Sequence, residues 1–396
     1  MSSRRKRSWP CFQWMMTAAA NRPQALYLHV PFCRTICYYC DFCHEVYRRE
    51  TALAWLQAVK KQLEGTEIGP LKTIYIGGGT PTSLDPDLLD ELLGLLDPYR
   101  RDTEEYTIEI NPETLTDEKA ELLRKHGVNR ASLGFQTADE TLLQELNRHH
   151  TPQDVEQAAA CLRSHDIDNI SLDLMYSLPG QTMASLQDSV RRALEIRPDH
   201  LSLYSLTVEP DTVFGRRGIE PLDEDTEADM YEWICRTLPA YGYEQYEISN
   251  FARCGRESRH NLVYWHYEDF IGISCGASGK EGNVRYDMPA RLSAYLADPL
   301  ARDELALSEE DMMFEMIMMG LRLKNGISEA DFSRRFGIDL HDIYGEVISR
   351  MTARGLLADD GGRLACTEAG FPLLNSVLVE FLPETENTLA PAAGEW

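Results

Sequence analysis

From residue 26 the chain alternates short runs of β-branched and other apolar residues with longer segments whose apolar positions recur at helical spacing. Short apolar runs are typical of strands buried on both faces, and the longer segments are typical of helices that cover such strands. The alternation predicts repeated strand–helix units around a parallel sheet. Six strands are expected, at residues 26–30, 73–76, 106–110, 130–135, 169–174 and 201–206.

The segments between these strands carry helix signals. The apolar positions after the second strand form one stripe, at Leu88, Leu89, Leu92, Leu93 and Leu96. Such a stripe would face the sheet. After the third strand, Thr116 is an expected N-cap and Gly127 an expected helix end.

Six consecutive right-handed units predict an α/β fold, a partial (β/α)6 barrel of the TIM type, with functional groups at the carboxyl ends of the strands. The pattern changes after residue 255. A Met-rich helix at 311–323, a helix near 341–354 and a hairpin at 357–364 indicate a small helical, winged-helix-like C-terminal domain. We therefore expect a disordered tail at 1–22, the barrel at 23–255, the C-terminal domain at 256–382 and a second tail at 383–396.

Composition and charge exclude several classes of protein. The 396 residues are 43% hydrophobic, enough for a large core, and 64 acidic against 39 basic residues leave a formal net charge of −25. This charge repels phosphate backbones, so we expect no nucleic-acid partner. No apolar run is long enough for a membrane span, and the basic, then apolar, start resembles a signal peptide only loosely because Pro10 and Gln13 interrupt it.

Four of the ten cysteines lie between residues 33 and 43, directly after the first expected strand. In a long acidic chain this clustering indicates metal binding in a reducing compartment, so a cytoplasmic location is expected. Three thiolates on one loop, Cys33, Cys37 and Cys40, suit a [4Fe-4S] cluster and leave one iron open to another ligand. Structural zinc, with Cys43 as the fourth ligand, is the alternative.

Polar and glycine residues follow the other expected strands. Gly77, Gly78 and Gly79 come after the second strand, where missing side chains let a ligand approach the backbone. Four polar residues lie at or just beyond strand ends, at Glu109, Gln136, Arg148 and Asp173. Buried polar groups need partners. These four suit a charged, hydroxylated ligand, or an internal salt bridge such as Glu109 with Arg148.

The three-then-two cysteine spacing resembles the radical S-adenosylmethionine (SAM) superfamily. The resemblance implies that the open iron binds the amino and carboxylate groups of SAM, and that one electron cleaves SAM to a 5'-deoxyadenosyl radical. The spacing from Glu109 to Asp173 is similar to that of the oxygen-independent coproporphyrinogen III oxidase group. By that resemblance, the SAM pocket consists of Tyr27, Tyr39, Gly78, Gly79, Thr80, Glu109, Gln136, Arg148 and Asp173.

The resemblance covers residues 24–382 and is strongest to the haem chaperone (HemW-like) branch of that group. Residues 176–182, 243–253 and 260–265 carry it. Two features differ from the oxidase: Phe42 stands where the oxidase has a further cysteine, and only 32 residues precede Cys33. His260, in a His-Asn-x-x-Tyr-Trp motif, is the haem ligand that the resemblance implies; His149 and His150 are weaker candidates.

The resulting hypothesis is a haem chaperone with a SAM-coordinated [4Fe-4S] cluster, which binds haem and transfers it to an unknown acceptor protein. The alternative is an enzyme of the same group, an oxygen-independent coproporphyrinogen III oxidase that decarboxylates propionates oxidatively.

Overall fold

The computed structural model describes residues 22–382, and the expectations for residues 1–21 and 383–396 lie outside this part. Its main sheet has nine strands in the order β11-β1-β4-β5-β6-β7-β8-β10-β9. Neighbours from β11 to β8 are parallel, whereas β10 and β9 are antiparallel. The strands are β1 (Ala25–Val30), β4 (Thr73–Gly78), β5 (Glu105–Ile110), β6 (Arg130–Gln136), β7 (Asn169–Tyr176), β8 (His200–Ser205), β9 (Glu244–Gln245), β10 (Asn250–Ala252) and β11 (Ile271–Ile273).

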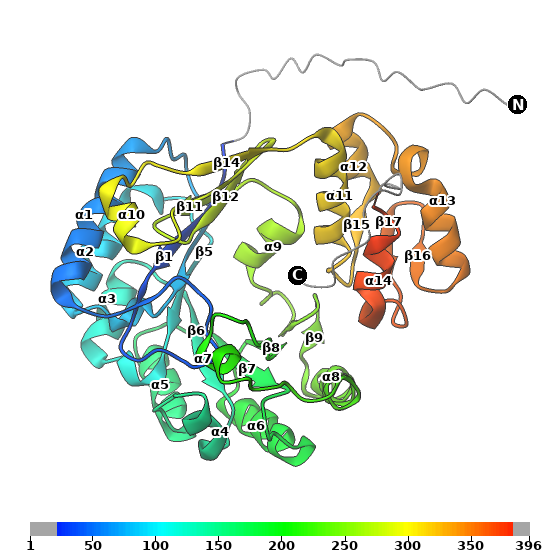
Figure 1. The fold of residues 1–396 in the computed structure, drawn as a ribbon. Helices are drawn as coiled ribbons and strands as arrows, with labels where there is room; N and C mark the ends of the chain where they lie inside the picture. The colour runs from blue at the N-terminus through cyan, green and yellow to red at the C-terminus, as the bar shows by residue number, and fades with distance from the viewer. Residues whose placement is uncertain (1–21, 383–396) are drawn as a thin grey trace, which may run out of the picture.

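All six expected strands are present, and helices cover the outer face of the curved sheet (Figure 1). These helices are α1 (Arg49–Gly65), α2 (Pro86–Leu96), α3 (Asp117–Lys125), α5 (Pro152–Ser164), α6 (Met183–Ile196) and α8 (Glu224–Thr237). The strands do not close into a ring, which confirms the predicted open α/β barrel. None of the helices in the described part of the chain is long and apolar enough to cross a membrane.

The helix boundaries follow the expected local chemistry. The leucine stripe of α2 is buried against the sheet. The hydroxyl of Thr116 accepts a hydrogen bond from the backbone N–H of Lys119 and caps α3. The chain leaves this helix at Gly127 with φ of +81°, a left-handed conformation that glycine adopts without steric cost.

The main sheet extends beyond the predicted domain boundary at residue 255, because β11 pairs in parallel with β1. Part of the segment that the sequence pattern separated from the barrel therefore belongs to its sheet. A three-stranded antiparallel sheet follows, and α10 packs against α1. This region consists of α9 (Arg259–Trp265), β12 (Ser278–Glu281), β13 (Val284–Asp287), α10 (Leu292–Ala297) and β14 (Asp303–Ala306).

The C-terminal part has its own hydrophobic core. Its three strands pair in the order β15-β17-β16 beside a group of helices, which agrees with the predicted winged-helix-like arrangement (Figure 1). The elements are α11 (Glu309–Gly320), β15 (Ile327–Ser328), α12 (Glu329–Phe336), α13 (Leu340–Ala353), β16 (Leu357–Asp359), β17 (Arg363–Cys366) and α14 (Leu374–Val379).

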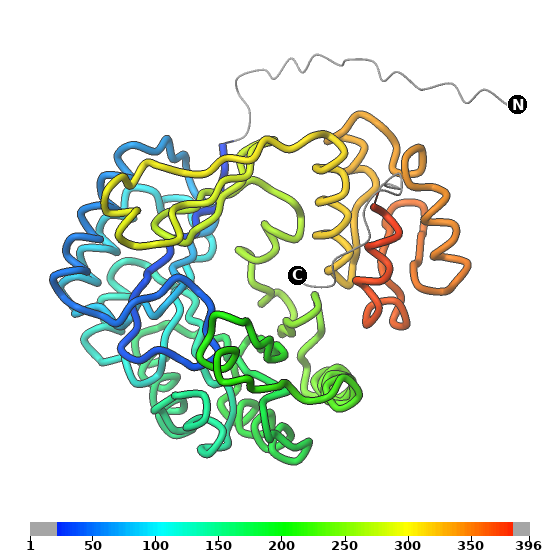
Figure 2. The backbone as a smooth tube through the Cα atoms, in the orientation of Figure 1, coloured from blue at the N-terminus to red at the C-terminus, as the bar shows by residue number. Residues whose placement is uncertain are grey.

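Two irregular segments meet at the carboxyl end of the barrel strands (Figure 2). The cysteine loop lies between β2 (Phe32–Cys33) and β3 (Glu45–Val46), which pair in parallel. The segment after β8 contains α7 (Val213–Arg216), and the N–H of Phe214 donates to the carbonyl of Tyr38 at 2.9 Å. The turn after β6 contains α4 (Glu140–Glu145).

Candidate functional site

A cavity of about 450 Å³ opens at the carboxyl end of the barrel strands. Polar side chains inside an apolar barrel gather there because parallel strands end at one rim. Of the residues that the sequence indicated, the cavity is lined by Cys33, Cys37, Tyr39, Cys40, Gly78, Gly79, Thr80, Glu109, Gln136, Arg148 and Asp173. Tyr27 and His260 are not among its lining residues.

The cysteine loop is held in place by backbone contacts. The N–H of Cys40 donates to the carbonyl of Cys37 at 3.3 Å, and the side chain of Asn147 donates to the carbonyl of Ile36 at 2.7 Å. Burial raises the pKa of Cys33 to about 11 and that of Cys40 to about 12. These thiols are therefore protonated at neutral pH unless a metal displaces the protons.

Cys43 points away from the three-cysteine group. Its thiol donates to the carbonyl of Ala290 at 2.8 Å and hydrogen-bonds to Cys275. The three other thiols do not converge within 4.8 Å of one another, whereas zinc thiolates at about 2.3 Å from the metal lie closer together than that. A cubane, in which each sulfur binds a different iron, suits this wider arrangement.

The glycine run brings the end of β4 against the cysteine loop. The N–H of Gly79 donates to the carbonyl of Val30 at 2.8 Å. A Cβ at Gly79 would lie only 2.8 Å from the carbonyl of Phe32 and 3.0 Å from the sulfur of Cys33. Gly78 has φ of +106°. Both positions therefore require glycine, one for space and one for conformation.

Glu109 is a buried carboxylate at the end of β5. It accepts hydrogen bonds from the hydroxyl of Tyr75 at 2.8 Å and from the N–H of Gly78 at 3.0 Å. Burial, together with the charge of Asp173, raises the pKa of Glu109 to about 7. Its carboxyl is therefore close to half ionised at neutral pH.

Asp173 lies on β7 and accepts hydrogen bonds from the hydroxyl of Ser132 at 2.9 and 3.0 Å. Burial raises its pKa to about 6. Two carboxyl groups with raised pKa values therefore line one buried cavity, and they favour a ligand that brings positive charge or hydroxyl donors.

Arg148 crosses the cavity wall and connects three elements. Its guanidinium donates to the Asn111 side chain at 2.6 Å, to the hydroxyl of Tyr39 at 3.3 Å, and to the amide oxygen of Gln136 at 3.0 Å. Its Nε–H is buried without a hydrogen-bond partner. Arg148 and Glu109 are not an ion pair in the described chain, so the internal salt bridge considered from the sequence is not formed.

The sequence patterns did not predict several residues that line the cavity, among them Tyr75, Asn111, Ser132 and Tyr204. Asn111 follows β5 directly, so the strand-end rule that selected its neighbours applies to it as well. Ser132 and Tyr204 are inward-facing strand residues. The alternation of inward and outward positions along a strand predicts that these side chains face inward. It does not predict that a serine or tyrosine at such a position binds a ligand.

His260 is the main difference between the expected and the observed site. It is only 1% exposed on α9, and its two ring nitrogens face the hydroxyls of Thr73 and Tyr264 at 2.9 and 2.8 Å. Burial lowers its pKa to about 3. Neither nitrogen is free for a haem iron, so we do not retain His260 as a haem ligand.

The remaining candidates from the sequence, Tyr27, His149 and His150, lie outside the main cavity. Tyr27 hydrogen-bonds to Nδ1 of His29 at 3.0 Å behind the glycine run. His150 is buried beneath the carbonyl of Phe135, and His149 is exposed. His44, which was not selected from the sequence, lines the main cavity.

A second cavity of about 450 Å³, which we call the outer cavity, is lined by the cysteine loop and by residues 209–216, which follow β8. Both cavities share several residues, namely Ile36, Cys37, Cys40, Asp41, His44 and Glu209. The Nδ1 of His44 lies 3.6 Å from the sulfur of Cys40. Residues of the cysteine loop, among them Cys37 and Cys40, therefore line both cavities.

Comparison with known families and curated proteins gives consistent matches. The model of the Radical SAM superfamily matches residues 27–193, and that of the HemN C-terminal domain matches residues 307–373. The Heme chaperone HemW of Lactococcus lactis is 39% identical over 376 residues, which cover 93% of this chain and 99% of the relative. The Heme chaperone HemW of Bacillus subtilis is 37% identical over 380 residues, 91% of this chain and 100% of the relative.

Among solved structures, the coproporphyrinogen III oxidase HemN from Escherichia coli superposes with a TM-score of 0.80. The match covers 91% of this chain and 90% of the oxidase, at 22% identity. At this identity the likeness establishes the shared fold, including the open barrel and the C-terminal helical domain.

Proposed function

The chain belongs to the Heme chaperone HemW family of radical SAM proteins, and from this membership and its cavity we propose that it binds haem and transfers it to an acceptor protein. It carries a SAM-coordinated [4Fe-4S] cluster in this role. The observation behind the proposal is an identity of 34–39% to three HemW chaperones over 91–93% of the chain.

The residues of the cavity fit the cluster and SAM. Cys33, Cys37 and Cys40 are the proposed cluster ligands, which leaves one iron for the amino and carboxylate groups of SAM. When bound, the reduced cluster supplies the electron that cleaves the SAM sulfonium. The thiols of Cys33 and Cys40 keep their protons without a metal because burial raises their pKa values, so cluster assembly releases these protons.

The buried polar groups suit the other parts of SAM. The unpartnered Nε–H of Arg148 matches the methionyl carboxylate, because a guanidinium binds a carboxylate through parallel hydrogen bonds. Glu109 and Asp173 accept from the ammonium and the ribose hydroxyls. Gly78, Gly79 and Thr80 line the cavity, as do Tyr39 of the cysteine loop and Gln136 at the end of β6. Tyr27 hydrogen-bonds to His29 and does not line the cavity, so we do not include it among the groups that contact SAM.

We place haem in the outer cavity, against the cysteine loop. His44 lines this cavity, and its Nε2 has no hydrogen-bond partner in the described chain. A free imidazole nitrogen is the commonest axial ligand of haem iron. Phe42, two residues before His44, is 63% exposed and lines the first cavity, and an exposed ring suits contact with a porphyrin face.

The acceptor is an unidentified protein. A cytoplasmic location is part of the proposal, because thiols that hold an iron–sulfur cluster need a reducing compartment.

The test is a haem titration of the anaerobically reconstituted protein, followed in the Soret region. Wild type is expected to bind one haem per chain. His44→Ala is expected to weaken binding about tenfold or more, equal to the loss of about 1.4 kcal/mol. His149→Ala, an exposed histidine that does not line either cavity, is the matched control and is expected to bind like wild type.

The oxidase alternative is tested on the same preparation. With coproporphyrinogen III, SAM and a reductant under anaerobic conditions, we expect no vinyl-bearing product. If a vinyl-bearing product forms and haem does not bind stoichiometrically, the chaperone proposal is wrong and the oxidase function is supported. If haem binding is unchanged in His44→Ala, the chaperone function stands but another residue must be the iron ligand.

A further inference from the structure

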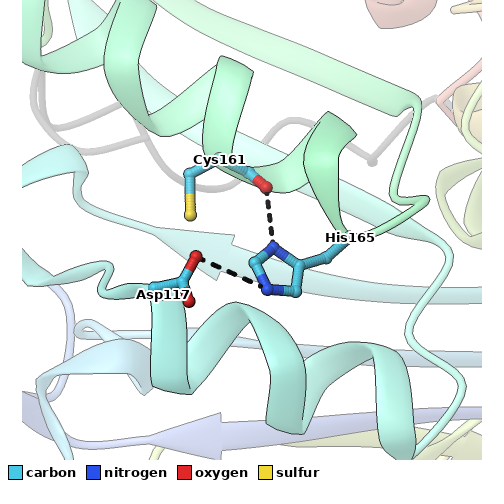
Figure 3. Close-up of side chains that lie close together, drawn as sticks. All are labelled: Asp117, Cys161 and His165. Carbon is cyan, nitrogen blue, oxygen red and sulfur yellow. Dashed lines mark hydrogen bonds and ion pairs between the residues drawn. The ribbon is translucent and has the colours of Figure 1, made fainter.

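Three side chains with metal-binding atoms come together on the outer surface of the barrel, away from both cavities. They are Asp117 at the start of α3, and Cys161 and His165 at the end of α5 (Figure 3). One ligand atom from each lies within 4.8 Å of the other two. Neither the haem nor the SAM proposal uses this group.

The two helices place these residues by their ordinary geometry. Cys161 and His165 are four residues apart, so they project from the same side of α5. Asp117 is the first residue of α3, which packs beside α5. Figure 3 shows the sulfur of Cys161 and the ring of His165 turned toward the carboxylate of Asp117.

The hydrogen bonds of His165 leave one nitrogen for a ligand. Its Nδ1 lies 3.0 Å from the carbonyl oxygen of Cys161 and 3.2 Å from the hydroxyl oxygen of Ser164, which donates to the same carbonyl at 2.7 Å. A carbonyl only accepts, so Nδ1 carries the proton and Nε2 of the neutral ring has a lone pair. A backbone carbonyl on one nitrogen and a metal on the other is the usual arrangement of a metal-binding histidine.

The Nε2 atom of His165 lies 3.5 Å from Oδ1 of Asp117. Two acceptors facing each other repel unless a proton or a cation lies between them. Nitrogen and oxygen ligands at about 2.0–2.2 Å from a tetrahedral zinc are about 3.4 Å apart. The observed separation matches this value.

We propose that Asp117, Cys161 and His165 bind a zinc ion, with water as the fourth ligand. Thiolate, imidazole and carboxylate together are a zinc donor set. The carboxylate of Asp117 is 86% exposed, which leaves room for the water. The ion would cross-link α3 to α5 on the outside of the barrel.

The thiol of Cys161 must lose its proton to bind zinc. Burial, and then the negative charge of Asp117, raise the pKa of its thiol. Zinc would replace the thiol proton, which leaves to solvent, and the cation would remove the repulsion between thiolate and carboxylate.

A second triad serves as an internal comparison. Glu329, His341 and Asp359 also bring ligand atoms within 4.8 Å in the C-terminal part. This group has two carboxylates and no thiol, and such oxygen-rich sets select harder cations. A variant at His341 therefore removes a similar histidine without touching the proposed site.

The experiment uses the reconstituted holoprotein with its iron–sulfur cluster. After incubation with one equivalent of zinc chloride and desalting, metal analysis is expected to find about one zinc beside about four irons per chain. Zinc K-edge absorption, which iron does not disturb, is expected to show one sulfur at about 2.3 Å and otherwise nitrogen or oxygen ligands.

The variants locate the ion. Cys161→Ser and His165→Ala are expected to lose zinc by at least about tenfold, the loss of one strong ligand, and to keep their iron and helical content. The exposed-cysteine variant Cys254→Ser and His341→Ala are expected to keep the zinc. The proposal is overturned by a holoprotein without zinc, by a spectrum with several sulfurs, or by zinc retained in both site variants. None of these results bears on haem binding.

Discussion

The Nε2 atom of His260 lies 2.8 Å from the hydroxyl of Tyr264, one turn further along α9. Its Nδ1 lies 2.9 Å from the hydroxyl of Thr73 on β4, so the ring connects the helix to the sheet. A haem-binding histidine needs a ring nitrogen that is free to bind the iron. The geometry of His260 therefore indicates a structural residue.

His260→Ala is expected to lower the free energy of unfolding by about 2–4 kcal/mol, because it leaves a cavity and two hydroxyls without their partner. Haem affinity of the folded fraction is expected to change less than about twofold. Urea unfolding and a Soret titration measure the two effects separately. A normally stable variant with much weaker haem binding would return His260 to the haem site.

The same residue predicts a pH dependence of stability. Burial lowers the pKa of His260 to about 3 in the folded chain, against about 6.5 in an unfolded chain. Only the unfolded state binds the proton between these values, so stability is lost as the pH falls from about 6.5 toward about 3. The loss from pH 7 to pH 5 is about 2 kcal/mol.

This contribution is measured by urea unfolding of the cluster-free chain at pH 7 and pH 5. In His260→Gln, which does not titrate, the difference between the two pH values is expected to shrink by the same amount. An equal pH difference in both proteins would rule out the contribution. The carboxyl groups titrate in both wild type and His260→Gln, so their contribution to the pH dependence cancels when the two proteins are compared.

Glu109 predicts a pH dependence of SAM binding. Its pKa of about 7 means that the carboxylate is mostly ionised at pH 8 and mostly protonated at pH 6. Because only the ionised form attracts an ammonium group, SAM affinity is expected to fall about tenfold from pH 8 to pH 6. Calorimetric titration of the reconstituted protein measures it. Glu109→Gln should bind weakly and with a flat pH profile; a sloping profile in this variant would assign the titration to another group.

Arg148→Lys is expected to weaken SAM binding about 10–100-fold, since an ammonium group replaces neither the Asn111 and Tyr39 contacts nor the free Nε–H. Iron content should stay unchanged, because Arg148 is not a thiol ligand. Arg191→Lys, on the exposed surface of α6, is the control. Equal SAM affinity in Arg148→Lys and wild type would remove the guanidinium from the SAM site.

Cys43→Ser is expected to keep about four irons per chain, whereas Cys40→Ser is expected to lose the cluster. The thiol of Cys43 points to Ala290 and Cys275, away from the other three. Iron analysis and electron paramagnetic resonance of the reduced proteins measure this. Loss of the cluster in Cys43→Ser would make its thiol a fourth ligand.

The fold and much of the site could be predicted from short-range patterns. Apolar runs and leucine stripes predicted the six central strands and α2, since burial on both faces of a sheet leaves few residue types in a strand. The cluster ligands could be predicted because all three thiols lie on one short loop. The strand-end rule found Glu109 and Asp173 for a similar reason, since every parallel strand ends at the same rim.

Contacts between distant segments could not be predicted in this way. The pairing of β11 with β1 moved residues beyond 255 into the barrel sheet, and no local pattern states which strand a three-residue segment will join.

The amino-acid sequence by itself determined the strand–helix repeat, the thiols of the cluster loop and the polar groups at the strand ends, because these depend on spacing along one chain. Only the tertiary structure decided that His260 is enclosed by Thr73 and Tyr264, that Cys43 turns toward Ala290 and Cys275, and that Asp117 meets His165. The physical reason is that burial and the partners of a side chain depend on residues remote in the sequence, and these set which nitrogen, oxygen or sulfur atom remains free to bind.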